Sequence, residues 1–242
     1  ALCETNRGCP FACTFCDWGQ ATASKVHELP LERIVAELRW MAERQIPYLY
    51  IVDANFGIRR RDEEIVAAIA TIAAETGYPR YVYFHLTKNA QERNLNTVRT
   101  LLQASIGCQV ALSMQDFTPR VLEAVQRDNI SREQALALRS TCNQGGIGTF
   151  NELLLGLPCQ GYDDVCRSVI DAVTPFASDS FFLYLCRLLD NTELASVAHR
   201  RRYGLQSRHC RATLTGEGHA PTWVDEFEEI VVATDAMPLS DW

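Results

Sequence analysis

The sequence lacks the features that mark several common protein classes. No apolar run approaches the roughly 18 residues that a membrane span requires, and the opening residues, ALCETNRG, contain no signal peptide. No stretch has low complexity, and we find neither a Ser-His-Asp constellation nor a pair of catalytic carboxylates. These absences argue against a membrane protein, a secreted precursor and the common hydrolase chemistries. Because ALCETNRG does not resemble a natural start either, we expect the chain to be part of a longer protein.

An excess of positive charge is also missing. The formal net charge is -7, with 23 basic against 30 acidic side chains, which works against an extended nucleic-acid surface. The two short basic runs, at 59–61 and 200–202, are interpreted as solvated faces or substrate-side contacts. We therefore expect neither a nucleic-acid partner nor a membrane.

The ten cysteines do not form a pattern typical of a disulfide framework, because they are spread over 242 residues. Five of them lie among apolar residues and are predicted to be small buried side chains in a reducing compartment. These are Cys108, Cys142, Cys159, Cys166 and Cys186. We accordingly expect a cytoplasmic protein.

Apolar runs rich in β-branched and aromatic residues alternate with segments of helical period. The predicted strands are 1–6, 46–52, 80–86, 108–114, 148–157 and 180–186, and continuous apolar runs of this kind suit strands that are buried on both faces. The predicted helices are 31–44, 62–75, 96–104, 119–127 with 132–141, and 163–173. This alternation predicts an α/β fold with a parallel sheet, either doubly wound or a partial (β/α)6 barrel of the TIM type.

The hydrophobic content of 47% is enough for one large domain, although two small domains are a possible alternative. We expect a core over 1–204 and a C-terminal closing segment over 205–242. Within that segment, 224–237 is predicted to be an amphipathic helix. His209, Cys210, His219 and Trp223 are candidate neighbours of a ligand, or else belong to an ordinary closing segment.

Polar residues follow most of the predicted strands, where both candidate folds place their active sites. The candidates are the loop around Cys9, then Asp53 and Asn55, then Thr87, Lys88 and Asn89, then Ser113 and Gln115, then Glu152, and finally Arg187 and Asn191. His85 lies within a strand and is interpreted as a core histidine.

Cys9, Cys13 and Cys16 lie in one short loop, ETNRGCPFACTFCDWG. Four thiolates close a zinc site or fill a four-iron cluster, whereas three leave one coordination position open. Phe11 and Phe15 are expected to shield the sulfurs from water. The alternatives are a zinc site completed by Cys3 or His27, a ferredoxin-like electron carrier, and incidental thiols or a disulfide.

The CxxxCxxC spacing, with an aromatic residue before the last cysteine, resembles the radical S-adenosylmethionine (radical SAM) superfamily. The resemblance implies that Cys9, Cys13 and Cys16 hold a [4Fe-4S] cluster and that S-adenosylmethionine occupies the open iron. One electron from the cluster would cleave S-adenosylmethionine to a 5'-deoxyadenosyl radical. The protein would bind and orient these cofactors.

Later segments resemble other parts of the same family over residues 3 to about 194. SMQDFTPRVLEAVQR (113–127) is similar to the fourth-strand region, which implies that Ser113 and Gln115 lie at the cofactor, with Gln115 at the ribose. Arg127 would bind the carboxylate of S-adenosylmethionine. Its alternative role is a favourable charge in the last turn of a helix. Glu152 resembles the acidic ribose ligand of the fifth strand.

Two further assignments follow from the resemblance. Gly156, Leu157 and Pro158 match the corner that packs against the adenine. The sequence VDANFG replaces the Gly-Gly-Glu motif of many members, so Asp53 and Asn55 would accept hydrogen bonds from the amino group. The alternative is an Asx turn that closes the strand.

The cysteine loop through DWG, DANFG, KN at 88–89, LSMQDF and LDNTELA together resemble the cobalamin-dependent branch, which includes carbapenem and other natural-product methylases. The resemblance implies a cobalamin-binding domain upstream, methylation of an unactivated carbon, and a small-molecule substrate that is carrier- or pantetheine-linked. It also implies an external reductant such as flavodoxin. The alternatives are a cobalamin-free radical oxidase, isomerase or cyclase, and a non-catalytic iron-sulfur or zinc protein.

Overall fold

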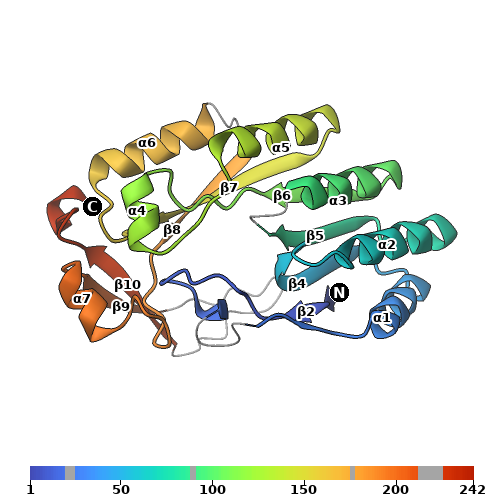
Figure 1. The fold of residues 1–242 in the computed structure, drawn as a ribbon, viewed down its shortest axis with the longest axis horizontal. Helices are drawn as coiled ribbons and strands as arrows, with labels where there is room; N and C mark the ends of the chain where they lie inside the picture. Colours follow the sequence, from blue (N-terminus) through green and yellow to red (C-terminus); the bar gives the residue numbers. More distant parts are fainter. Residues whose placement is uncertain (20–24, 88–90, 175–177, 212–225) are drawn as a thin grey trace.

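The computed structural model describes residues 1–19, 25–87, 91–174, 178–211 and 226–242, and in them the main sheet has six parallel strands (Figure 1). The strands are β1 (Leu2–Cys3), β4 (Tyr48–Phe56), β5 (Tyr81–Leu86), β6 (Gly107–Ala111), β7 (Gly148–Leu155) and β8 (Ser180–Leu185), in this spatial order. Spatial order follows chain order, so each helix crosses over to the next strand. The predicted partial (β/α)6 barrel is confirmed.

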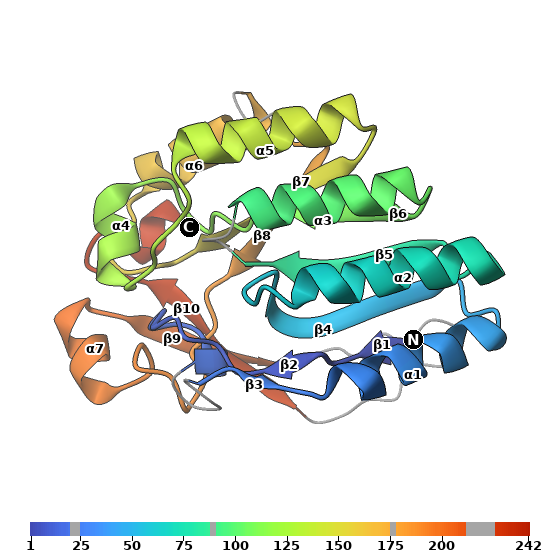
Figure 2. The same ribbon diagram turned by 45° about the vertical axis from the view of Figure 1, so that its right-hand side comes forward.

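The crossover helices lie together on the outer side of the sheet (Figure 2). They are α1 (Leu31–Glu43), α2 (Asp62–Thr76), α3 (Gln91–Gln103), α5 (Arg132–Gln144) and α6 (Tyr162–Val173), and the short α4 (Pro119–Ala124) precedes α5. Their apolar stripes pack on the sheet, and the rings of Phe56 and Phe84 meet 5.6 Å apart in this core. None of the described helices is both long and apolar enough to cross a membrane.

The outer face of the sheet is better covered than the inner face. In β4, Leu49 and Ile51 are buried, whereas Tyr50 and Val52 on the inner face are half-buried. All six residues of β8 are exposed. The prediction of strands buried on both faces is therefore wrong. A closed eight-stranded barrel fills its interior with its own side chains, but six strands leave the inner face open.

The N-terminal strand is shorter than predicted. β1 ends at Cys3, and Asn6–Arg7 (β2) instead pairs antiparallel with His27–Glu28 (β3). Arg61 stabilises this small sheet, because its guanidinium donates hydrogen bonds to the carbonyls of Thr5 and Leu29. The chain thus leaves the main sheet before it enters the cysteine loop.

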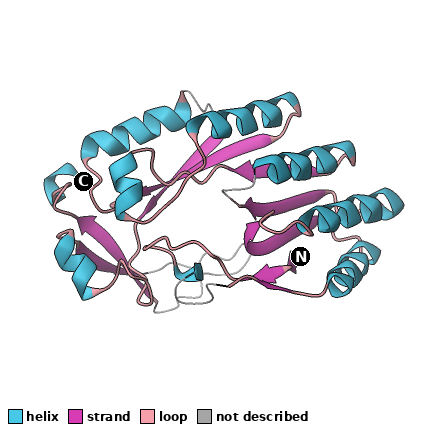
Figure 3. Cartoon of the chain, in the orientation of Figure 1, coloured by secondary structure: helices cyan, strands magenta, loops and turns pink. Residues whose placement is uncertain are grey.

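The C-terminal segment is a hairpin rather than the predicted helix (Figure 3). After α7 (Val197–Arg202), β9 (Gln206–Arg211) pairs antiparallel with β10 (Phe227–Ala233), and a 3-10 turn follows at Leu239–Asp241. Ile230, Val231 and Val232 favour a strand because they are β-branched. Val231 is fully buried, and its amide donates to the Cys186 carbonyl at 2.9 Å. The hairpin therefore packs against the end of β8.

The prediction of buried cysteines is confirmed for three of the five and wrong for the other two. Cys108, Cys142 and Cys186 are buried. Burial raises the pKa of Cys108 and of Cys186 to about 12, so both stay protonated. Cys159 and Cys166 are only partly buried, because they lie in a turn and on α6, at the outside of the fold.

Candidate active site

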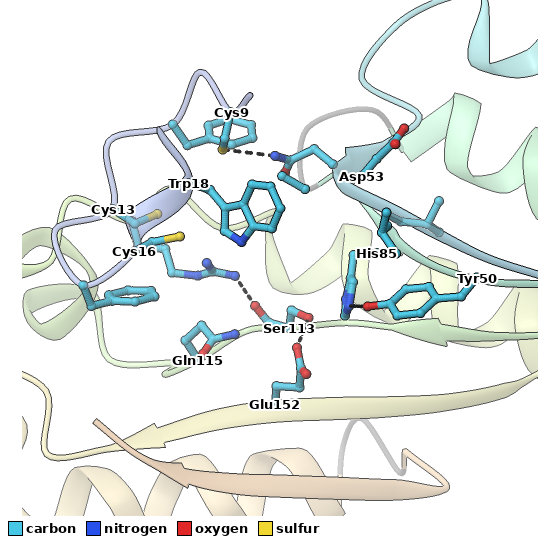
Figure 4. A pocket seen from close by; sticks show the side chains of 17 residues that line it. Cys9, Cys13, Cys16, Trp18, Tyr50, Asp53, His85, Ser113, Gln115 and Glu152 are labelled. Carbon is cyan, nitrogen blue, oxygen red and sulfur yellow. Dashed lines mark hydrogen bonds between the residues drawn. The ribbon is translucent and has the colours of Figure 1, made fainter. Parts of the chain in front are cut away.

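The carboxyl ends of the parallel strands and the cysteine loop enclose a pocket of about 340 Å³ (Figure 4). Its walls come from the loop and from four neighbouring strand ends. The lining residues are Cys9, Phe11, Cys13, Phe15, Cys16, Trp18, Tyr50, Val52, Asp53, Ala54, Asn55, His85, Leu86, Ser113, Gln115, Arg127 and Glu152. Of the residues assigned above to the cluster and to S-adenosylmethionine, this lining lacks Gly156, Leu157 and Pro158.

The shape of the cysteine loop is fixed by hydrogen bonds to other parts of the fold and by close packing within the loop. The Thr14 amide donates to the Val125 carbonyl at 3.0 Å, and the Thr14 carbonyl accepts from the Leu194 amide at 2.9 Å. Gly19 closes the loop, since a Cβ there would lie 2.2 Å from the Phe11 carbonyl oxygen and 2.9 Å from that of Cys9. The three thiols are therefore carried on a loop of defined shape.

The thiols line one wall of the pocket without converging on a single point. Within the described residues, no three His, Cys, Asp or Glu side chains are gathered closely enough to hold one metal ion. A zinc ion requires each sulfur at about 2.3 Å, whereas an iron-sulfur cluster takes each thiolate at a separate iron. In a cluster, the three thiols of the loop would each bind a separate iron.

The residues considered as a fourth zinc ligand lie elsewhere. The Cys3 thiol is buried and donates to Glu37 on α1 at 3.9 Å. Burial and the neighbouring Glu37 raise its pKa to about 12. His27 is exposed on β3, and neither residue lines the pocket. Their positions argue against a zinc site that uses either one.

Arg127 lies between the cysteines and the strand ends. Its guanidinium donates to the Ser113 carbonyl and, at 2.8 Å, to the Asn129 side chain, and it also interacts with Cys13 and Cys16. Burial lowers its pKa. Because α4 ends at Ala124, the alternative role in the last turn of a helix is wrong. The arrangement presents a positive charge beside the thiols.

Ser113 and Gln115 follow β6 in an unusual backbone conformation. Their φ angles are 39° and 64°, in the left-handed region that non-glycine residues rarely occupy. The Gln115 amide donates to the Glu152 carbonyl at 2.8 Å, and the Ser113 hydroxyl donates to the Glu152 carboxylate. The strained turn therefore places three polar side chains at one side of the pocket (Figure 4).

Asp53 and Asn55 have different partners, although they are two residues apart on β4. The Asp53 carboxylate accepts hydrogen bonds from the Thr5 amide and hydroxyl and from both nitrogens of Asn6. Burial raises its pKa, and these hydrogen bonds oppose the rise. Asn55 donates from Nδ2 to the Cys9 sulfur at 3.0 Å. Asp53 thus anchors the start of the loop, and Asn55 contacts a predicted cluster ligand.

The predicted alternative for Asp53, an Asx turn, is wrong. Asp62 closes the turn after β4 instead, because its carboxylate accepts from the Gly57 and Arg59 amides at 2.9 and 3.0 Å. Burial raises the pKa of Asp62 to about 6.

Sequence reasoning missed two side chains on the far wall. His85 was expected in the core, but it is half-buried, lines the pocket, and shares a 3.0 Å hydrogen bond with the Tyr50 hydroxyl. Side chains alternate between the faces of a strand, so Tyr50 and His85 lie on the inner face, opposite their buried neighbours Ile51 and Phe84. Trp18 also lines the pocket. The sequence analysis used it only as part of the DWG motif and assigned it no role in the site.

Three predicted adenine contacts lie outside this pocket. Gly156, Leu157 and Pro158 are held by Gln160, whose Oε1 accepts from the Gly156 amide at 2.8 Å, and a Cβ on Gly156 would meet Trp242. An adjoining pocket of about 350 Å³ shares Phe15 and Gln115 with the first. Its other lining residues are Leu154, Tyr184, Leu185, Cys186, Arg187 and Leu189.

His209 and Cys210 lie on the exposed strand β9 and line neither of these two pockets. Lys88, Asn89, His219 and Trp223 lie outside the described residues.

Comparisons with known proteins identify the family of the chain. Residues 3–168 match the family model of the radical SAM superfamily. The chain is 36% identical, over its whole length, to the cobalamin-dependent radical SAM methyltransferase TokK of Streptomyces tokunonensis. It is 35% identical to the 2-(S-pantetheinyl)-carbapenam-3-carboxylate methyltransferase of Streptantibioticus cattleyicolor. It spans 35% of the length of each of these curated relatives.

A similar fold occurs in a solved structure of the radical SAM methyltransferase TsrM from Kitasatospora setae. The TM-score is 0.72 over 93% of this chain and 42% of that one, at 18% sequence identity.

Proposed function

Because the chain belongs to the radical SAM superfamily, we propose that it forms the core of an enzyme that binds a [4Fe-4S] cluster and S-adenosylmethionine. The observation that carries this proposal is a pocket whose lining includes three thiols, the Arg127 guanidinium and the carboxylates of Asp53 and Glu152. When bound, these cofactors supply a 5'-deoxyadenosyl radical through reductive cleavage of S-adenosylmethionine.

The side chains around the pocket have matching roles. Cys9, Cys13 and Cys16 hold the cluster as thiolates, and Phe15 shields it from water. Arg127 binds the carboxylate of S-adenosylmethionine, since its planar fork suits a planar anion. The nearness of Arg127 to Cys13 and Cys16 supports this role.

The rest of the cofactor pocket is polar on one side. Gln115 and Glu152 bind the ribose hydroxyls, and Ser113 orients Glu152 through their hydrogen bond. Asn55 accepts from the amino group through its carbonyl oxygen, while its nitrogen stays on Cys9. Asp53 supports this wall, because Thr5 and Asn6 already occupy its oxygens. The Gly156, Leu157 and Pro158 corner supports the adenine side through Leu154.

We further infer a cobalamin-dependent methylation of an unactivated carbon in a natural-product substrate. The support is the similarity to two relatives whose names specify methyltransferases, one of them acting on a pantetheinyl substrate. The substrate is a small molecule that is carrier- or pantetheine-linked. An upstream domain of the full-length protein binds cobalamin, and an external protein such as flavodoxin supplies electrons.

Anaerobic reconstitution of the full-length protein tests the cofactor assignment. We expect about four irons and four sulfides per chain, and release of 5'-deoxyadenosine that depends on dithionite. Alanine in place of Cys9, Cys13 and Cys16 abolishes both, whereas the matched change Cys166→Ala preserves them. One bound zinc and no cleavage would refute the proposal.

The branch assignment has a separate test. Full-length protein should carry the absorption spectrum of cobalamin and transfer a labelled methyl group from S-adenosylmethionine to a pantetheinyl acceptor. If the full-length protein cleaves S-adenosylmethionine reductively but binds no cobalamin, the result would instead support a cobalamin-free radical oxidase, isomerase or cyclase.

A further inference from the structure

A row of aromatic rings crosses the open inner face of the sheet. Starting from β4, the ring centroids of Tyr50 and Tyr83 are 4.9 Å apart, and those of Tyr83 and Phe150 are 6.3 Å apart. Phe150 and Phe182 follow at 5.7 Å, and Phe182 and Tyr184 at 5.9 Å. We name Tyr50, Tyr83, Phe150, Phe182 and Tyr184 the aromatic row.

The aromatic row is continuous with the cofactor pocket. Tyr50 lines the first pocket and Tyr184 lines the adjoining one. Glu152, at the edge of the first pocket, is close enough to affect the ionisation of all three tyrosines in the row. A ligand that enters the pocket can therefore extend along the row without leaving the protein.

Much of this apolar surface is accessible to a ligand. Phe182 and Tyr184 are 46% and 45% exposed, whereas Phe150 in the centre is buried. Contiguous exposed aromatic side chains are uncommon in soluble domains and mark binding surfaces. The rings offer flat contact area for methylene groups at little conformational cost.

Hydrogen-bonding groups accompany the rings. Tyr50 is bonded to His85, but within the described part of the chain the hydroxyls of Tyr83 and Tyr184 have no hydrogen-bond partner. Gln109 lies beside Tyr83 in the strand register, and its side-chain amide has no described partner either. Burial, together with Glu152, raises the pKa of Tyr83 to about 12. Its hydroxyl therefore remains a donor at neutral pH.

The charge around the row disfavours an anionic ligand. The Glu152 carboxylate acts electrostatically on the three tyrosines of the row. Arg187 lines the adjoining pocket with Tyr184, but its guanidinium already pairs with Glu228 at 2.7 Å. An uncharged group with amides or hydroxyls avoids this repulsion and can pair with the tyrosine hydroxyls and the Gln109 amide.

We propose that the aromatic row binds the part of the substrate that does not react, a flexible uncharged arm that carries amides or hydroxyls. This inference rests on the proposed function, in which a small-molecule substrate is methylated next to the bound cofactors. A pantetheine arm has this chemistry. The row would then determine which substrates the enzyme accepts.

The test uses the full-length loaded enzyme, the double variant Tyr83→Phe/Tyr184→Phe and two carbapenam substrates, with and without a pantetheine arm. Each lost hydrogen bond weakens binding by roughly twofold to tenfold. We expect the double variant to raise the KM of the arm-bearing substrate about tenfold or more, and that of the armless substrate less than about twofold. Tyr162→Phe, on the outer surface of α6, is the matched control and leaves both unchanged.

Binding of free pantetheine to the same proteins, followed by saturation-transfer NMR, provides a readout that needs no turnover. A weaker signal in the double variant supports the proposal. Equal KM values for the arm-bearing substrate in parent and variant, or equal effects on both substrates, would overturn it. If the parent enzyme does not cleave S-adenosylmethionine at all, the proposed function fails instead, and the NMR comparison still decides the role of the row.

Discussion

Residues that are neighbours in the sequence have different roles in the site. Asp53 and Asn55 belong to one motif, yet Asp53 is saturated by Thr5 and Asn6 while Asn55 contacts the Cys9 sulfur. Hydrogen bonds to ligating sulfurs tune the potential and stability of iron-sulfur clusters. Asn55 is therefore the residue through which β4 acts on the cluster directly.

Asn55→Ala tests this role. Without the amide donor the reduced, more negative cluster loses stabilisation, so we expect a lower midpoint potential and roughly tenfold to hundredfold less S-adenosylmethionine cleavage. Redox titration followed by EPR measures the potential. Asn96→Ala, whose side chain bonds Glu63 on the surface, is the control. An unchanged potential in Asn55→Ala would contradict the role.

Gly19 is the second decisive single residue, because only a residue without a side chain fits between the Phe11 and Cys9 carbonyls. We expect Gly19→Ala to open the loop and to lose most of the reconstituted iron. Iron and sulfide analysis after anaerobic reconstitution measures this. Gly148→Ala is the control, since a Cβ there has only ordinary contacts beyond 3.6 Å. Full iron content in Gly19→Ala would show that the loop adapts.

Among the elements, the β9–β10 hairpin shows how tertiary contacts choose between a helix and a strand. Arg200 on α7 forms two hydrogen bonds with Glu229 on β10, at 2.6 and 2.7 Å, and Ser207 on β9 donates to the same carboxylate. These three residues join α7 and both strands. The hairpin is therefore attached to the rest of the fold by the Arg200–Glu229 ion pair as well as by the buried side chain of Val231.

The ion pair predicts a pH-dependent stability. The bonds from Arg200 and Ser207 lower the pKa of Glu229 to about 2, against about 4.3 in an unfolded chain. Because the folded-state pKa is depressed, this stabilisation is complete above about pH 5 and is lost as the pH falls toward 2. Its full value is on the order of 2 to 3 kcal/mol.

We therefore expect Glu229→Gln to lower the free energy of unfolding at pH 7, and the difference from the parent protein to shrink below about pH 5. Urea unfolding between pH 7 and pH 3 measures it. Glu75→Gln, whose ion pair with Arg39 is half-exposed, is the control and changes little. A difference that does not depend on pH would exclude the ion pair as its cause.

At the scale of the whole molecule, the sheet is an open half-barrel with one unprotected side. Phe181, Leu183 and Leu185 of the edge strand β8 are 38%, 41% and 44% exposed, and among the described strands only β7 pairs with β8. Exposed apolar edge strands promote association. The 242-residue chain alone should therefore associate through β8.

Leu183→Lys tests this expectation, because a charge in the centre of an edge strand opposes pairing. We expect the variant to sediment as a smaller species than the parent chain at equal concentration in analytical ultracentrifugation. Trp40→Lys removes an exposed aromatic ring from α1, far along the sheet from β8, and should leave the association unchanged. Equal association of Leu183→Lys and the parent chain would exclude the β8 edge.

Much of the site was predictable because its residues belong to local patterns. The cysteine spacing, the polar residues after each strand and the Gln115 to Arg127 segment are all short-range signals. Two kinds of error remained. The 224–237 helix was wrong because a short apolar run fits either period, and His85 was assigned to the core because its exposure depends on whether the sheet closes.

The sequence by itself determined the alternation of strands and helices, the three-cysteine loop and the family to which the chain belongs, since each of these depends on residues near one another in the chain. Only the tertiary structure decided that Asn55 contacts Cys9, that Asp53 holds Thr5 and Asn6, and that the inner face stays open beneath the aromatic row. These contacts join residues some fifty positions apart or depend on the number of strands in the sheet, and local patterns carry no information about either.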